Sequence, residues 1–117
     1  MVRRSSNITT DRIDHLLKNK NLKLVFGDLT DPSNINSLIK KIKPDEIYNL
    51  GAQSHVKVSF EVPDFTAQVD GLGLIRILSA VHNYCPNCRI YQASTSEIFG
   101  GYKKYYPQNE NTLLLPK

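Results

Sequence analysis

Short apolar segments alternate with amphipathic segments along the chain, and this order constrains the fold more than any other feature. Apolar runs typical of strands occupy residues 1–4, 22–26, 46–50 and 89–94. Between them, apolar residues recur at helical spacing over residues 32–42 and 63–84. Strands that alternate with helices form parallel sheets, because each helix carries the chain back to the start of the next strand. The pattern therefore predicts an α/β fold with a doubly wound parallel sheet.

Local start signals predict where two of the helices begin. Asp31 precedes Pro32, which suits an N-cap followed by a first helical residue that needs no N–H donor. A shorter helix is expected over residues 9–19, with Thr9 or Thr10 as its cap. Residues 102–117 show no periodicity, so we expect an irregular tail.

Length and charge narrow the classes of protein. The 117 residues suit about one domain, and no apolar run approaches the roughly 20 residues of a membrane helix. The first residues have no apolar signal-peptide core, so we expect a cytoplasmic protein. The net charge is +4, but the 15 Lys and Arg residues are interleaved with acidic ones. We therefore do not expect a nucleic-acid partner.

Cys85 and Cys88 form a Cys-Pro-Asn-Cys sequence between a predicted helix and a predicted strand. A CxxC pair can be redox-active or can supply half of a zinc site. A structural zinc ion needs four ligands, and adding the nearby His82 brings the set only to three. We therefore expect a Pro-Asn turn and no metal site.

A polar, turn-forming sequence follows each predicted strand. These sequences are RRSS, GDLTD, GAQSH and STSE. The carboxyl ends of parallel strands meet at one edge of the sheet, where α/β proteins bind their ligands. Four such ends exceed what capping requires, so they predict the rim of one crevice. The local alternative for residues 94–97 is a helix N-cap with an acidic first turn.

The individual strand ends suit different parts of a dinucleotide. Arginines in residues 3–6 favour the 2′-phosphate of NADP, which they can bind with bidentate geometry. Asp28 could accept from an adenine amino group with Leu29 against the ring, or form an Asx-turn with Gly27. Small residues within 51–54 would let the backbone approach a ligand closely.

Thr95 and Glu97 follow the last predicted strand and are candidate catalytic groups. A carboxylate at a crevice can act as a general base, and a threonine hydroxyl can bind a substrate hydroxyl. His55 also lies at a strand end, but it has no partner that the sequence identifies. We expect His55 to be structural.

Taken together, these segments resemble the GDP-mannose 4,6-dehydratase family of the extended short-chain dehydrogenase/reductase superfamily. The resemblance depends mainly on NLGAQSHVKVSF followed by YQASTSE, and it weakens after Gly101. It implies a Rossmann-type domain in which residues 1–101 form the middle of the NADP-binding domain and residues 102–117 an irregular tail. The nearest alternative is an NAD-dependent dehydratase or epimerase for a UDP- or dTDP-sugar, which the arginine pair and GAQSHV count against. A non-catalytic Rossmann-like nucleotide-binding or interaction module is the alternative from another class.

The resemblance assigns roles to particular residues. It implies that Thr95 and Glu97 are catalytic. It implies cofactor contacts at Arg3, Arg4, Ser5, Ser6, Asp28, Leu29, Leu50, Gly51, Ala52, Gln53, Ser54 and Phe65. Phe65 stands where the family often has tyrosine, so one hydroxyl contact is lost. The implied reaction converts GDP-mannose into GDP-4-keto-6-deoxymannose and water through an internal redox cycle on NADP.

Two family motifs do not occur in these 117 residues. The sequence has no GxxGxxG turn, and none of its six tyrosines is followed by lysine four positions later. We therefore expect an internal fragment with a partial sheet that lacks its first strand. Because that strand is central in the doubly wound order, we expect low stability and no activity in isolation. Either the remaining strands close up, or a partner supplies the missing one. The resemblance also implies a homo-oligomer, with residues 7–17 as a possible interface.

Overall fold

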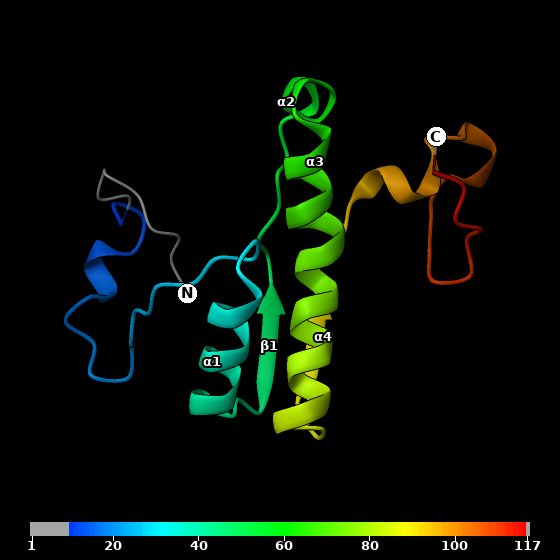
Figure 1. The fold of residues 1–117 in the computed structure, drawn as a ribbon. Coiled ribbons are helices and arrows are strands. Elements are labelled where there is room, and N and C mark those ends of the chain that lie inside the picture. Colours follow the sequence, from blue (N-terminus) through cyan, green and yellow to red (C-terminus); the bar gives the residue numbers. More distant parts are fainter. Residues whose placement is uncertain (1–9, 117) are drawn as a thin grey trace.

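The structure is a computed structural model that describes residues 10–116 (Figure 1). It is an α/β arrangement with one small parallel sheet and helices of unequal length. The strands are β1 (Glu46–Asn49) and β2 (Arg89–Gln92). The α-helices are α1 (Pro32–Ile42), α2 (Val56–Glu61), α3 (Pro63–Thr66) and α4 (Gly73–Tyr84).

The sheet pairs β1 with β2 in parallel, from Glu46 opposite Arg89 to Asn49 opposite Gln92. The chain returns from the end of β1 to the start of β2 through α2, α3 and α4, as the alternating pattern predicted. Side chains alternate along both strands. Ile47 and Ile90 pack against the core. The opposite pairs, Glu46 with Arg89 and Tyr48 with Tyr91, are exposed on the other face.

The predicted start of α1 is confirmed. The Asp31 carboxylate accepts a hydrogen bond from the Asn34 N–H at 3.0 Å, and Pro32 is the first helical residue. Lys43 ends the helix in the left-handed conformation, with φ of 47°. Its N–H donates to the Ile39 carbonyl at 2.8 Å. Short-range signals therefore fix both ends of this helix.

The predicted helix over residues 63–84 is one helical run with a change of pitch. Between α3 and α4 lies η2, a π-helical turn over Ala67–Leu72. Turns of this kind are rare and often lie near functional sites. The Cys-Pro-Asn-Cys sequence after α4 forms the expected turn, in which the Cys88 N–H donates to the Cys85 carbonyl at 2.9 Å.

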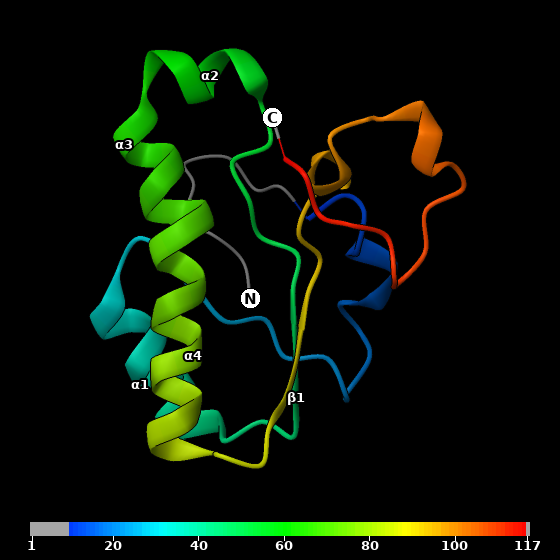
Figure 2. The same ribbon diagram turned by 90° about the vertical axis from the view of Figure 1, so that its right-hand side faces the viewer.

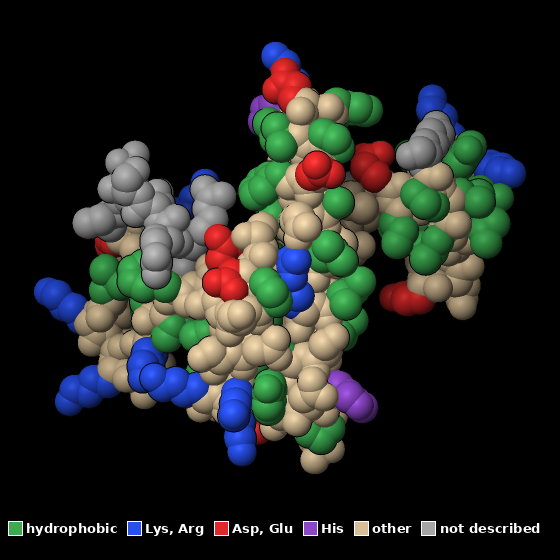
Figure 3. Space-filling model, viewed as in Figure 1, with side chains coloured by type: hydrophobic (Ala, Val, Ile, Leu, Met, Phe, Trp, Pro, Cys, Tyr) green, Lys and Arg blue, Asp and Glu red, His purple; other side chains and the backbone are tan. Residues whose placement is uncertain are grey.

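The core lies between α1, α4 and one face of the sheet. Figure 2 shows both helices on the same side of the two strands. The buried apolar side chains are Leu29, Ile35, Ile39, Ile77, Ala80 and Val81. The outer face of the helical run over η2 and α4 exposes Leu72, Ile75 and Leu78. Figure 3 shows apolar side chains along this run. No helix in the described part of the chain is long and apolar enough to span a membrane.

Two predicted elements are wrong. Residues 22–26 were expected to form a strand, but only Phe26 makes an isolated bridge, and its side chain is 63% exposed. The described sheet has only the strands β1 and β2, so this segment gains no ladder of hydrogen bonds. Residues 9–19 were expected to be a helix, but residues 10–19 contain a single 3₁₀ turn, Asp14–Leu16, with no buried residue. Without packing, so short a helix is marginal in water. The predicted strand end at residues 1–4 lies outside the described residues.

The helical run contains two glycines whose substitution should have opposite effects. A Cβ at Gly73 would lie 3.0 Å from the Leu29 Cβ, whereas a Cβ at Gly71 would meet nothing within 4 Å. We expect Gly73→Ala to lower the free energy of unfolding by about 1–3 kcal/mol through overpacking. We expect Gly71→Ala to raise it by up to about 1 kcal/mol, because alanine restricts the unfolded chain. Urea denaturation checks both, and equal shifts of the same sign would contradict this packing.

Candidate functional site

The carboxyl ends of β1 and β2 leave the sheet side by side and are tied together by Asn49. This side chain is 8% exposed. Its Nδ2 donates to Oε1 of Gln92 at 2.7 Å, and its Oδ1 accepts from the Gly51 N–H at 3.2 Å. The Asn49 carbonyl accepts from the Ala93 N–H at 3.2 Å. The sequence analysis did not single out Asn49. The signal that could have identified it is an asparagine at the end of an otherwise apolar strand.

The loop after β1 is held by hydrogen bonds within the loop and by hydrogen bonds to α3 and η2. The Gln53 N–H donates to Oδ1 of Asp70 at 2.8 Å, and its Nε2 donates to Oγ1 of Thr66 at 3.2 Å. Its Oε1 accepts from the His55 N–H at 2.7 Å. The Gln53 side chain therefore braces the loop against α3. The four other predicted cofactor residues here are exposed, namely Leu50, Gly51, Ala52 and Ser54.

The predicted adenine contacts lie in the turn before α1. Oδ1 of Asp28 accepts from both the Thr30 N–H, at 2.9 Å, and the Thr30 hydroxyl, at 2.7 Å. This is an Asx-turn that closes on Thr30, whereas the alternative from the sequence was an Asx-turn with Gly27. The Leu29 side chain is 8% exposed and belongs to the core. A ligand that reaches this turn would therefore contact the Leu29 backbone rather than its side chain.

The turn at 28–30 and the loop at 50–54 meet at Leu29. A Cβ on Gly51 would lie 2.9 Å from Cδ1 of Leu29, so the loop passes close to this side chain. Glycine at position 51 permits that approach. The structure thus brings two of the predicted cofactor segments together. Phe65 lies further along on α3 and is 37% exposed, and the predicted residues Arg3, Arg4, Ser5 and Ser6 lie outside the described residues.

Thr95 and Glu97 follow β2, at the same edge of the sheet. Oγ1 of Thr95 accepts from the Glu97 N–H at 3.2 Å and so caps η3, the 3₁₀ helix over Ser96–Phe99. Ser94 precedes it with φ of 56°, a conformation that few non-glycine residues adopt. The side chains of Thr95 and Glu97 are both exposed. The local capping interpretation is therefore correct, and it leaves the Glu97 carboxylate accessible.

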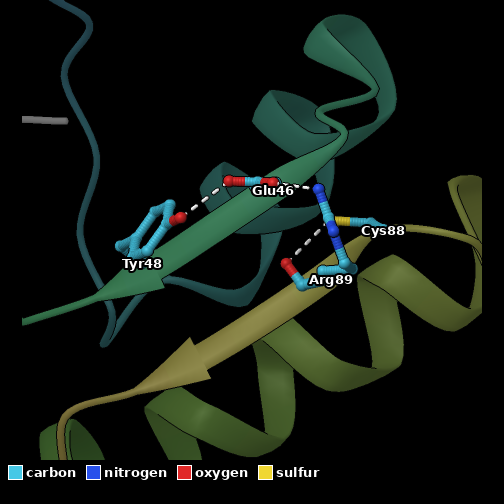
Figure 4. A network of polar contacts seen from close by, with 4 residues as sticks. All are labelled: Glu46, Tyr48, Cys88 and Arg89. Carbon is cyan, nitrogen blue, oxygen red and sulfur yellow. Dashed lines mark hydrogen bonds and ion pairs between the residues drawn. The ribbon is translucent and has the colours of Figure 1, made fainter.

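A separate polar network lies toward the amino ends of the strands, on the exposed face (Figure 4). Glu46 forms an ion pair with Arg89 and accepts a hydrogen bond from the Tyr48 hydroxyl at 2.7 Å. That hydrogen bond, followed by the negative charge of Glu46, raises the pKa of Tyr48. Burial, followed by the nearby Cys85 thiol, raises the pKa of Cys88, whose Sγ donates to the Arg89 carbonyl at 3.6 Å. Within this network the ion pair between Glu46 and Arg89 links the two strands.

Comparison with known proteins shows the family to which this chain is similar in sequence. The family model described as GDP-mannose 4,6 dehydratase matches residues 1–117. The chain belongs to the GDP-mannose 4,6 dehydratase family. The human GDP-mannose 4,6 dehydratase is 48% identical over 125 residues, which cover 100% of this chain and 33% of the human protein. The protein from Yersinia enterocolitica is 51% identical, over 98% of this chain and 32% of its own length.

The chain thus spans about a third of the length of these dehydratase relatives. Solved structures show the same fold at lower identity. A dTDP-4-dehydrorhamnose reductase from Clostridium acetobutylicum matches with a TM-score of 0.69 and 24% identity, over 89% of this chain and 38% of that one. A UDP-glucose 4-epimerase from Thermus thermophilus, in complex with NAD, matches with a TM-score of 0.67 and 24% identity, over 86% and 33%. The described part of this dehydratase-family chain is therefore a partial Rossmann-type fold.

The position of Asn49 in the dehydratase-family fold predicts a large cost for its removal. Asn49→Ala would remove the partner of the Gln92 amide oxygen and of the Gly51 N–H in a partly buried place. We expect it to lower the free energy of unfolding by about 2–3 kcal/mol. Asn36→Ala is the matched control, since Asn36 Nδ2 bonds the Pro32 carbonyl on the exposed side of α1. Denaturant melts that show equal losses for both variants would contradict the role of Asn49.

Proposed function

We propose that this chain forms part of the NADP-binding domain of a GDP-mannose 4,6-dehydratase. In this proposal residues 1–101 are the middle of that domain, and residues 102–117 are its irregular tail. The main support is the family match over residues 1–117, combined with two strand ends that meet at one edge of the sheet. A parallel sheet places its ligand site at that edge. We further propose a cytoplasmic homo-oligomer with GDP-mannose as its substrate.

The close packing of two strand-end segments supports a nicotinamide dinucleotide as the ligand in this proposal. The loop after Asn49 approaches Leu29 so closely that a Cβ at Gly51 would force the loop or the Leu29 side chain to shift. Such a small-residue loop at a strand end leaves backbone donors near a ligand. The arginines at positions 3 and 4 support NADP rather than NAD, because a guanidinium matches the 2′-phosphate. Among proteins of this fold, the RMD structure from Pseudomonas aeruginosa was solved in complex with NADPH.

The residues that would hold this cofactor are those that the family resemblance assigned. They are Arg3, Arg4, Ser5, Ser6, Asp28, Leu29, Leu50, Gly51, Ala52, Gln53, Ser54 and Phe65. Within the described part, the turn at 28–30 and the loop at 50–54 pack together where Gly51 approaches the Leu29 side chain. The cofactor would accept a hydride from C4 of the mannose and return it to C6.

Thr95 and Glu97 would act on the sugar. A ketone at C4 acidifies the proton on C5, and the exposed Glu97 carboxylate would remove it. The C6 hydroxyl then leaves, and together with that proton it departs as water. When the hydride is delivered to C6, C5 takes up a proton, which balances the proton released from the C4 hydroxyl. The Thr95 hydroxyl uses an oxygen lone pair to cap η3, so its O–H remains able to donate to a sugar oxygen. A base for the C4 hydroxyl would have to come from residues other than these 117, since the sequence has no Tyr-x-x-x-Lys pair.

We expect Glu97→Gln, made in the protein at its natural length, to slow formation of the 4-keto-6-deoxy product by about 100- to 10,000-fold. Exchange of the C5 proton with deuterated solvent should be lost in parallel, because glutamine cannot accept the proton. Glu110→Gln is the matched control, since Glu110 is an exposed residue of the tail. Product analysis by mass spectrometry checks the rate, and unchanged C5 exchange in Glu97→Gln would disprove the role of this carboxylate.

We expect the 117-residue polypeptide by itself not to turn over GDP-mannose. The proposed reaction needs a base for the C4 hydroxyl and a pyrophosphate-binding turn, which these residues do not include. The check is a product assay with added NADP⁺, alongside the intact mass of the protein from its source. Measurable product from the isolated polypeptide would contradict the proposal.

A further inference from the structure

Arg76 on α4 directs its guanidinium at backbone rather than at an acidic partner. Its Nη1 donates to the Leu29 carbonyl at 2.7 Å and to the Gln68 carbonyl at 3.0 Å. Its Nη2 donates to Oε1 of Gln68. Within residues 10–116 no ion pair joins Arg76 to an aspartate or glutamate. Arg76 is partly buried, so these three hydrogen bonds set its position.

One of the groups held by Arg76 belongs to the π-helical turn. Gln68 lies in η2, where the wider π-helical turn displaces backbone carbonyls from the usual α-helical ladder. Arg76 bonds both the carbonyl and the side chain of Gln68. These bonds fix the guanidinium against its own helical run. The same Nη1 also donates to the Leu29 carbonyl in the turn before α1.

The other group held by Arg76 is the peptide between Leu29 and Thr30. Arg76 binds the carbonyl of this peptide, and the N–H of the same peptide donates to Oδ1 of Asp28 at 2.9 Å. A peptide unit is planar, so fixing the carbonyl also fixes the direction of the N–H. The Thr30 hydroxyl also donates to Oδ1 of Asp28, at 2.7 Å, so the orientation of the carboxylate depends in part on the plane that Arg76 holds.

We propose that Arg76 is a positioning residue for the adenine end of the dinucleotide. It acts through the Leu29–Thr30 peptide on Asp28, the residue proposed to accept from the adenine amino group. This inference rests on the proposed function and adds a residue to its cofactor site. In this proposal Arg76 acts through the peptide and does not bind the ligand directly. A change at Arg76 should therefore weaken binding of the adenosine half and spare the nicotinamide half.

The test compares Arg76→Met and Arg76→Lys with wild type in the protein at its natural length. The probes are adenosine 2′,5′-bisphosphate and nicotinamide mononucleotide, measured by calorimetry. We expect Arg76→Met to weaken the adenosine probe about tenfold, or about 1.4 kcal/mol, and the nicotinamide probe less than twofold. Arg76→Lys should lie between, because one ammonium cannot hold both carbonyls and the Gln68 amide with the geometry of a guanidinium. At saturating NADP⁺, kcat should stay within twofold of wild type.

Arg89→Met is the matched control, since it removes an arginine from the exposed end of β2, where its partner is Glu46. It should leave both affinities unchanged. If Arg76→Met does not fold, Arg76→Lys decides by the same measurement. Equal affinity of wild type and the Arg76 variants for the adenosine probe would overturn the inference about Arg76 and leave the proposed function intact. Wild-type protein that binds neither this probe nor NADP⁺ would overturn the proposed function itself.

Discussion

The packing of α1 and α4 against one face of the β1–β2 pair holds the rest of the described structure in place. All the buried apolar side chains of the described residues belong to this single cluster. Segments away from it, such as residues 10–20 and 102–116, contain no buried residue. Burying apolar surface is the main source of stability in a domain of this size, and these two segments contain only turns and short 3₁₀ helices. The strand ends that form the candidate site are fixed because they extend directly from this cluster.

Leu29 links the core to the candidate site. Its side chain packs with α1 and α4, its Cδ1 limits how closely the loop at Gly51 can approach, and its carbonyl is held by Arg76. Full burial of a leucine stabilises a protein by about 1.5–3 kcal/mol. The same residue therefore contributes to folding and sets the spacing of two predicted cofactor segments. A substitution here would affect stability and ligand binding together.

The parts of the fold that depend on nearby residues could be predicted from the sequence. The Asp31 cap, the start of α1 and the helical run from 63 to 84 each follow from signals within a few residues. Residues 22–26 have an equally apolar composition, but a strand forms only where a neighbour supplies hydrogen bonds, and composition does not show the neighbour. Asn49 and Arg76 were missed for a related reason. Their partners, Gln92 and Leu29, lie 43 and 47 residues away.

The two interpretations of the strand-end polar residues are compatible. Asp28 stabilises an Asx-turn and Thr95 caps a 3₁₀ helix, which are the local roles that the sequence suggested. A side chain fixed by a local hydrogen bond loses less conformational entropy when it binds a ligand, since part of that cost is already met in the folded chain. Local capping can therefore prepare a site. For Thr95 the cap uses one lone pair of the oxygen and leaves the O–H free to turn toward a sugar. For Asp28 the direction of the carboxylate depends in part on a peptide that the distant Arg76 holds, so a contact spanning 47 residues helps to determine how a local turn is presented.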